Sequence, residues 1–448
     1  MSPAVRAQAF MWGGAAIVLA LLPFVFTSGA SLTMMSLMGF AIVFALSYNM
    51  LLGQTGMLSF GHAVYYGLGG FMTAHALNVV GAGKWPIPLP VMPLAGGLAG
   101  LAFAILFGWA STRRAGTAFA MISLGIGELV AACSLILKGF FGGEGGISTS
   151  RTATLKFFGL NFGPQVQVYY LIAAWCLLCM VAMYAFTRTP LGRMCNAVRD
   201  NPERAEFVGY STQMVRYIAF CVSGFFAGIA GGLAAIHYEI VTASVVGAAP
   251  SGFVLLMAYI GGVGFFIGPV IGAVLMTALQ ISLSDYTGAW LLYVGLMFVV
   301  MVMYVPWGLG GLLLMQRPLL QHGAWRRVLP VYAMAAVPVL VLLAGTVALI
   351  ETAHHLLVKT TEGTAMSLFG IAYDAKSLVA WAVIVLLVAV GLAGLRFVAP
   401  RVSDAYHGAV QRARSGAGAT STAATAGTGA AGTGTASTGA GASAGAGR

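Results

Sequence analysis

The sequence predicts an all-α polytopic membrane protein, with about ten transmembrane helices in a core and two more in a C-terminal extension. Of the 448 residues, 59% are hydrophobic and only 7% are charged, and the mean hydropathy is +0.92. An ordinary soluble domain carries about 25% charged residues. Apolar runs of about twenty residues, long enough to cross a bilayer as helices, recur along the whole chain. Many of the 61 glycines lie inside these runs, where they permit close packing of membrane helices.

The apolar segments follow one another with short connections. They are 10–28, 32–52, 59–80, 89–110, 116–138, 166–187, 216–237, 240–284, 289–305, 328–350 and 377–399. We expect the first segment to be a retained helix rather than a signal peptide, because it has only Arg6 before it and a second apolar run follows at once. The segment 240–284 is long enough for two helices, and Gly261, Gly262 and Gly264 mark a break between them.

Basic residues set the orientation, since they concentrate on the cytoplasmic side of membrane proteins. If the N-terminus is cytoplasmic and 240–284 crosses twice, sixteen of the 22 basic residues lie inside. The six outside are Lys84, Lys138, Arg151, Lys156, Lys359 and Lys376. We therefore expect a multi-pass membrane protein with both termini in the cytoplasm. The net charge of +11 then reflects topology and contact with lipid, not nucleic-acid binding.

Three regions follow from this pattern. Residues 1–318 form a transmembrane core that carries a cytoplasmic loop at 188–216. Residues 319–400 form an extra transmembrane hairpin. Residues 401–448 form a cytoplasmic tail rich in Gly, Ala, Ser and Thr, which we expect to be disordered because this composition cannot bury a core.

The loop concentrates charge in a chain that otherwise avoids it. The stretch 188–217 holds eight of the chain's 33 charged residues. Thr189-Pro190 and Asn201-Pro202 each place an N-cap residue before a proline at the first helical position, and Gly209 is suited to end a helix. The loop therefore predicts two short helices outside the bilayer. Such helices need a surface, either this protein's own cytoplasmic face with its lipids or a cytoplasmic partner.

The segment P-L-G-R-x-x-x-A-x-R-D-N-x-x-x-A-x-x-x-G from Pro190 to Gly209 resembles the coupling loop of ABC-importer permeases of the branched-chain amino acid type. In that family the loop inserts into a groove on the ATPase subunit. The resemblance assigns ATPase coupling to Pro190, Leu191, Gly192, Arg193, Ala197, Arg199, Asp200, Asn201, Glu203, Ala205 and Gly209.

Four further stretches resemble the same family in the expected order. They are GQTGMLSFGHAVYYGLGGF (53–71), AFAMISLGIGELV (118–130), GGEGGI (142–147) and YVPWGLGGL (304–312). GGEGGI departs from the family, which commonly has Pro and Asn where this chain has Glu144 and Gly145. That departure leaves the identity of the substrate open.

The chain carries no site for the energy source of such a transporter. It has no G-x-x-x-x-G-K-[ST] loop, and GAGKW at 81–85 lacks the first glycine and the Ser or Thr. The resemblance implies a location in the bacterial inner membrane. It also implies two cytoplasmic ABC ATPase subunits that bind ATP and Mg²⁺, a second homologous permease subunit and a periplasmic substrate-binding protein. No cofactor or metal is expected on this chain, since Cys176 and Cys179 lie in an apolar run without further ligands.

Candidate residues of the substrate path lie on two segments. Glu128 is the one acidic residue well inside a span of the core, so it faces either the interior with its polar cavity or a hydrogen-bonding neighbour helix. Gly56, Ser59, Gly61 and His62 lie in a glycine-rich segment that permits an interrupted helix. The free N–H groups of such a helix face a substrate carboxylate, or the polar residues are satisfied locally.

Two rows of glycine predict close helix packing, either within the subunit or against a second permease. They are Gly224, Gly228 and Gly232, and Gly264, Gly268 and Gly272. The exported loop 139–166 is the candidate contact for the binding protein.

The sequence thus predicts the permease subunit of an ATP-driven importer, not an enzyme. The resemblance implies branched-chain or related amino acids as substrates, with urea, short amides or small carboxylates as alternatives within the family. An ion-coupled secondary transporter would need several intramembrane ionisable residues, and a membrane enzyme would need a catalytic set. The core offers neither.

Overall fold

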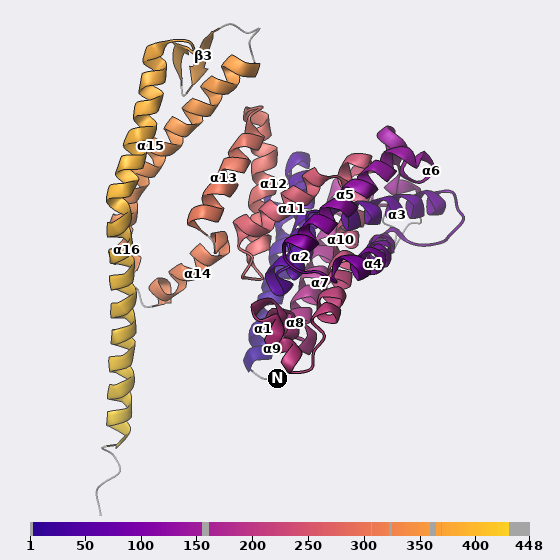
Figure 1. The fold of residues 1–448 in the computed structure, drawn as a ribbon, viewed down its shortest axis with the longest axis horizontal. Helices are drawn as coiled ribbons and strands as arrows, with labels where there is room; N and C mark the ends of the chain where they lie inside the picture. The colour runs from indigo at the N-terminus through magenta and orange to yellow at the C-terminus, as the bar shows by residue number, and fades with distance from the viewer. Residues whose placement is uncertain are drawn as a thin grey trace, which may run out of the picture. The chain divides into compact units, whose positions relative to one another are not determined.

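The structure is a computed structural model that describes residues 3–154, 161–305, 307–321, 325–358, 364–368 and 370–429. The chain divides into two compact units, Met1–Leu313 and Leu314–Arg448 (Figure 1). Both are helical, and the strands form only two short antiparallel pairs among the described residues. An all-α polytopic membrane protein is thereby confirmed.

Unit 1 is a bundle of helices joined by short connections. Its helices are α1 (Pro3–Val25), α2 (Gly29–Thr55), α3 (Ala63–Gly81), α4 (Met92–Ser111), α5 (Thr117–Ile136), α6 (Lys138–Phe141), α7 (Gln165–Arg188), α8 (Pro190–Asp200), α9 (Pro202–Phe207), α10 (Thr212–Tyr238), α11 (Ala248–Gly261), α12 (Gly268–Tyr286) and α13 (Trp290–Tyr304). Its strands are β1 (Ile147–Ser148) and β2 (Ile240–Val241). Helix α14 (Gly308–Gln321) begins in unit 1 and ends in unit 2.

Nine helices of the described residues are long and apolar enough to cross a membrane, and the bent pair α13 and α14 raises this to ten. Helix α3 has 19 residues and is not among them, although we predicted a span at 59–80. Gly, Tyr, His and Asn dilute its hydropathy, and α3 is enclosed by other helices instead of facing lipid. In the apolar windows of α1 and α16, by contrast, only 6% and 11% of the residues are buried within the chain.

Helix α10 forms the centre of unit 1 and is buried over most of its length. Glycines let it approach its neighbours at backbone distance: a Cβ at Gly228 would lie 2.9 Å from the backbone of Gly96 on α4. Gly224 of α10 faces Ala104 of α4, and Gly232 of α10 faces Thr73 of α3. This row of glycines therefore packs within the subunit, one of the two alternatives left open by the sequence.

The segment 240–284 contains two helices, as predicted, and they run antiparallel. Gly268 packs against Gly261, and Gly272 against Met257. Gly264 was wrongly included in this packing row: it precedes α12, and a Cβ there would meet no atom within 4 Å. Helix α11 has only 14 residues and spans about 21 Å, less than the hydrocarbon core of a bilayer.

One end of unit 1 collects the N-terminus, the charged loop and the end of α4. Trp12 of α1 packs edge-to-face on Tyr184 of α7 with ring centroids 5.5 Å apart, so the start of α1 lies beside the end of α7 from which α8 begins (Figure 1). The hydroxyl of Tyr217 on α10 donates to the carbonyl of Ile105 on α4 at 3.2 Å. This end therefore gathers Arg6, Arg113, Arg114 and the arginines of the charged loop.

The break between α11 and α12 lies at the same end. A Cβ at Gly53, near the end of α2, would lie 2.6 Å from the carbonyl oxygen of Val263. Helix α11 therefore ends, and α12 begins, at this end of unit 1.

Unit 2 is a helical hairpin with a strand pair. Helices α15 (Trp325–Val358) and α16 (Leu378–Gly429) pack antiparallel, with Gly391 against Leu342 and Gly394 against Pro338. Strands β3 (Ala365–Leu368) and β4 (Ile371–Asp374) pair between them, with Ala365 opposite Asp374.

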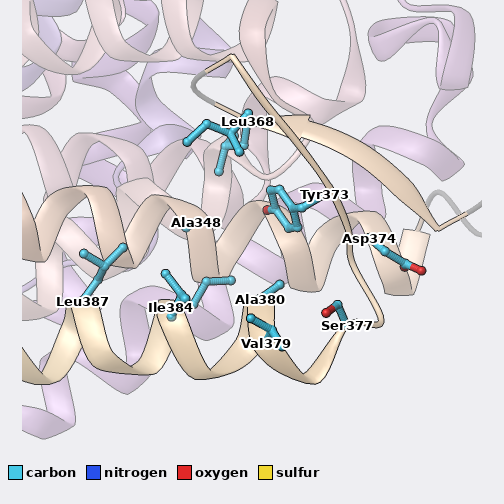
Figure 2. Close-up of a pocket in the computed structure, with 11 residues that line it drawn as sticks. Ala348, Leu368, Tyr373, Asp374, Ser377, Val379, Ala380, Ile384 and Leu387 are labelled. Atoms are coloured by element: carbon cyan, nitrogen blue, oxygen red, sulfur yellow. The ribbon is translucent and has the colours of Figure 1, made fainter.

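A cavity of about 390 Å³ lies between the strand pair and the two helices of unit 2. Figure 2 shows Leu368 and Tyr373 above it and Ile384 and Leu387 of α16 along its floor. Asp374 and Ser377 lie at one end of this largely apolar lining.

The structure describes part of the tail for which we expected disorder. Helix α16 continues through residues 401–429, and residues 430–448 lie outside the described residues. Alanine, which has the highest intrinsic helix propensity, is frequent in this stretch, and after Pro400 no proline interrupts it.

Candidate functional site

The charged loop forms the two capped helices that its prolines and caps predicted. The hydroxyl of Thr189 accepts a hydrogen bond from the N–H of Gly192 at 3.1 Å and begins α8. The amide oxygen of Asn201 accepts from the N–H of Arg204 at 2.9 Å and begins α9. Gly209 follows α9 with φ +92°, a conformation that favours glycine.

Helix α8 is amphipathic and buries one face on unit 1. Cys195 and Val198 are buried with Ala205 of α9 and with Val215 and Ala219 of α10. Gly192 packs against the backbone of Thr187 at the end of α7, where a Cβ would lie 2.8 Å from the Thr187 Cα. Burial raises the pKa of the Cys195 thiol to about 12. The two helices are thus fixed to the bundle as one body.

The residues assigned to ATPase coupling divide between the two faces of this body. Gly192 and Ala205 are buried and Leu191 is half-buried, so they hold the helices in place. The exposed residues are Pro190, Arg193, Ala197, Arg199, Asp200, Asn201, Glu203 and Gly209.

Two apolar side chains on the outer surface were missed by the sequence reasoning. Phe207 is 90% exposed and Val208 69% exposed at the end of α9. Exposed Phe is unusual outside the bilayer, and such side chains commonly anchor protein interfaces. Their position directly before Gly209, in an otherwise charged segment, was the available signal.

Arg199 is partly exposed, yet its guanidinium points toward the bundle. Its Nη1 donates a hydrogen bond to the backbone carbonyl of Gly53 in the last turn of α2. Its side chain also covers Gly56, where a Cβ would lie 3.0 Å from the Arg199 Cγ. A cation is favourable at this position because the last carbonyls of a helix carry partial negative charge.

Residues Gly56–His62, which we call the connecting segment, join α2 to α3. Gly56 ends α2 with φ +70°. The chain then turns back along α2: the hydroxyl of Tyr48 donates to the carbonyl of Ser59 at 3.0 Å, and His62 Nε2 lies 3.0 Å from the Ser47 hydroxyl. Since that hydroxyl donates to the Phe44 carbonyl at 2.7 Å, it accepts from His62. Helix α3 therefore begins inside the bundle, at Ala63 instead of residue 59.

The connecting segment does not form an open substrate path within this subunit. Ser59 and His62 have no exposed surface, and His62 stacks on Phe44. The N–H groups expected to be free are bonded to serines: Phe60 donates to the hydroxyl of Ser123 at 3.0 Å. Ala63 donates to the hydroxyl of Ser251 at 3.1 Å. These two N–H groups are satisfied locally, whereas the Ser59 hydroxyl and His62 Nδ1 are buried without a hydrogen-bond partner among the described residues.

Glu128 lies on the outer face of α5, exposed to the surroundings of the subunit. It has no hydrogen bond or ion pair within the described part of the chain, so it makes no structural bond to a neighbouring helix of this subunit. It belongs to an exposed stripe at spacings of three and four residues: Ala118, Met121, Gly125, Glu128, Ala132 and Leu135. Because an ionisable group in a membrane is costly against lipid, protein or water must cover this stripe.

At the end of unit 1 opposite the charged loop, one arginine holds several segments together by hydrogen bonds. Arg151 donates to the Glu239 carboxylate through its backbone N–H at 2.9 Å and to the carbonyls of His237 and Gly163 through its guanidinium. Strand β1 pairs with β2 beside it. Glu144 is exposed on the adjoining turn. Residues 155–160 of the exported loop lie outside the described residues.

A profile of the family described as "Branched-chain amino acid transport system / permease component" matches residues 9–306. The chain belongs to this permease family. The family match covers the helices of unit 1 and ends before α14, so the helical hairpin of unit 2 lies outside it. The resemblance drawn from the charged loop is thereby confirmed.

Relatives of this permease carry several names. "High-affinity branched-chain amino acid transport system permease protein LivM" of Escherichia coli is 30% identical over 301 residues, which are 62% of this chain and 69% of that protein. The corresponding LivH protein of Salmonella typhimurium is 22% identical over 267 residues, 54% of this chain and 81% of that protein. "Fructose import permease protein FrcC" of Rhizobium meliloti is 24% identical over 206 residues, 42% of this chain and 54% of that protein. No solved structure matches the chain.

Metal-binding clusters were also sought in the permease. No group of three His, Cys, Asp or Glu side chains in its described residues is arranged to hold a metal ion. Cys176 and Cys179 are both buried, and the thiol of Cys176 contacts the thioether of Met180 at 3.7 Å.

Proposed function

We propose that this chain is the permease subunit of an ATP-driven importer, with ATP and Mg²⁺ bound by two separate cytoplasmic ATPase subunits. The observation that carries the proposal is the pair α8 and α9, a rigid two-helix body outside the spans that exposes Phe207 and Val208. An apolar surface in water is stable when a partner covers it. The basic residues gathered at this end of unit 1 support its location on the cytoplasmic side of the inner membrane. Both termini of the chain are then cytoplasmic.

The second partner is a homologous permease subunit that covers the exposed stripe of α5. Glu128 supports this pairing, since two facing subunits would enclose a polar path and keep the carboxylate away from lipid. The two differently named permease relatives, LivM and LivH, support a second permease that is homologous but not identical.

The substrate class is branched-chain or related amino acids, delivered by a periplasmic binding protein. The names of relatives that are branched-chain amino acid permease proteins support the class. The exported turn at Glu144, next to the Arg151 anchor, supports the docking position. Urea, short amides and small carboxylates are the alternative substrates, because Glu144 and Gly145 depart from the family's usual turn.

An ion-coupled transporter is the second candidate function. Glu128 is the observation that favours it, since such proteins bind the coupling ion through intramembrane acids. A transporter of that kind has no need of α8 and α9.

Reconstitution of the complex in vesicles tests the proposal. Uptake that requires the ATPase subunits and ATP is the expected result, and uptake that follows an ion gradient without any ATPase would overturn it. The ligand retained by the binding protein encoded beside this chain decides the substrate.

A further inference from the structure

The connecting segment Gly56–His62 contacts two elements to which the proposed function gives different roles, one in energy coupling and one beside the substrate path. One is α8, which receives the ATPase, and the other is α5, whose outer face carries Glu128.

The contact with α8 is made through Arg199. Its guanidinium bonds the carbonyl of Gly53, and its aliphatic part lies on Gly56, the first residue of the connecting segment. Any displacement of α8 must therefore move the end of α2 and the start of this segment, or break that hydrogen bond.

The contact with α5 is made by backbone. The N–H of Phe60 donates to the hydroxyl of Ser123, which itself donates to the carbonyl of Ala120 at 2.8 Å. The Cα of Gly61 lies close to Gly127, where an added Cβ would be 3.4 Å away, and a Cβ at Gly61 would collide with the carbonyl of Ser123. At Gly61 no side chain separates the two elements, and at Phe60 only the Ser123 hydroxyl bridges them, so movement of one is passed to the other.

The segment is also held too firmly to absorb movement by bending. Its residues Met57, Ser59 and His62 are buried, and hydrogen bonds from Tyr48 to Ser59 and from His62 to Ser47 fix its path along α2. Buried segments with fixed hydrogen bonds move as units, because interiors are close-packed.

We propose that the connecting segment transmits the displacement of α8 to α5, and that Ser123 and Gly61 are positioning residues for this transmission. The inference rests on the proposed function, because it assumes that an ATPase moves α8. Neither residue touches the surface of α9 or the exposed stripe of α5, so the inference concerns coupling and not ATPase docking or substrate contact.

Ser123→Ala is the decisive variant, because it removes the acceptor of the Phe60 N–H and leaves the packing of α5 nearly unchanged. Ser134→Ala is its matched control: Ser134 is also buried on α5, and its hydroxyl donates only to the carbonyl three residues earlier. We expect both variants to co-purify with the ATPase subunits. Ser123→Ala should lower uptake about ten-fold while Ser134→Ala retains it.

A second readout reports movement of α5 directly. Met121→Cys, on the exposed stripe, is labelled by a water-soluble maleimide in a Cys133→Ala background, since the other four cysteines are buried. With the ATPase bound, we expect the labelling rate to differ between the ATP-bound and nucleotide-free complexes. Ser123→Ala should abolish this difference, whereas a role in folding alone would leave it unchanged.

The outcomes separate this inference from the proposed function. If the wild-type chain binds no ATPase, the proposed function fails. If the ATPase binds and Ser123→Ala preserves both uptake and the nucleotide-dependent labelling, the transmission route is wrong. Gly61→Ala provides a second test at the same contact. In a double-mutant cycle, Arg199→Ala and Ser123→Ala should be non-additive, because they interrupt one route.

Discussion

The guanidinium of Arg199 donates a hydrogen bond to the backbone carbonyl of Gly53, so the first helix of the charged loop is tied to the end of the second helix of the bundle. This inward orientation gives Arg199 a role in the attachment of α8. The proposed contact with the ATPase would then be made by the outward residues, above all the exposed Phe207.

Replacement of Arg199 should loosen α8. We expect Arg199→Ala to lower the local stability of α8 by about 1 kcal/mol, since a hydrogen bond from a charged group is lost at a partly exposed site. Hydrogen exchange of the α8 amides measures this. Arg193→Ala, on the exposed face of the same helix, should leave the exchange unchanged. Equal exchange in the two variants would contradict the role of Arg199.

Replacement of Phe207 should weaken binding of the ATPase and leave the stability of the permease unchanged. Phe207→Ala removes a 90% exposed ring, so the thermal stability of the isolated permease should stay within about 0.5 kcal/mol of wild type. Co-purification of the ATPase should fall at least ten-fold, as for an interface anchor worth about 2 kcal/mol. Tyr286→Ala is the control, because Tyr286 is 87% exposed at the opposite end of unit 1. Retained ATPase binding by Phe207→Ala would remove this residue from the interface.

The thiol of Cys195 should resist alkylation. Its pKa is raised to about 12 by burial, so the reactive thiolate is scarce at pH 8, and rising pH restores it only near that value. Mass spectrometry after maleimide treatment should show no modification of Cys195 in the folded protein between pH 7 and pH 9. Denaturation should make it reactive. Rapid modification of the native protein would mean that α8 detaches spontaneously.

The carboxylate of Glu128 should matter for transport and not for folding. Glu128 has no partner in the described part of the subunit, so Glu128→Gln should leave thermal stability unchanged. The KM of substrate uptake should change, because we place Glu128 beside the substrate path. Met121→Leu tests the same stripe without a change of charge. Unaltered uptake kinetics in Glu128→Gln would exclude this residue from the path.

A side chain at Gly228 should separate α10 from α4. In Gly228→Ala the added Cβ meets the backbone of Gly96 and Gly100, and we expect a destabilisation of about 2 kcal/mol or more. Gly295→Ala on α13, where the added Cβ meets nothing within 4 Å, should be neutral or slightly stabilising. Thermal unfolding in detergent compares the two. Equal stability would show that the helices separate without cost.

Local chemistry explains which parts of the fold were predictable from the sequence. The helices of the charged loop follow from Thr189-Pro190, Asn201-Pro202 and Gly209, because caps and prolines act within one turn. The break at Gly262 was equally local, since its φ of +107° favours glycine. The long spans followed from hydropathy alone.

The remaining features depend on which helices become neighbours. The start of α3 inside the bundle requires Ser47, Ser123 and Ser251 from three other helices, which no sequence window brings together. The outward direction of Glu128 likewise depends on which face of α5 the bundle covers. Gly264 lies four residues before Gly268, as the packing row requires, but it precedes the first residue of α12. The spacing of glycines alone therefore did not distinguish a packing row from a loop.

The glycine contacts among α3, α4 and α10 have a consequence for how a path opens. Gly69, Gly96 and Gly228 bring the three backbones together with no side chains between them. Side chains that change rotamer can open a gate, but backbones in contact can only separate as whole helices. The three helices therefore behave as a fixed block against which other parts move, and a route for substrate must form along the outside of that block.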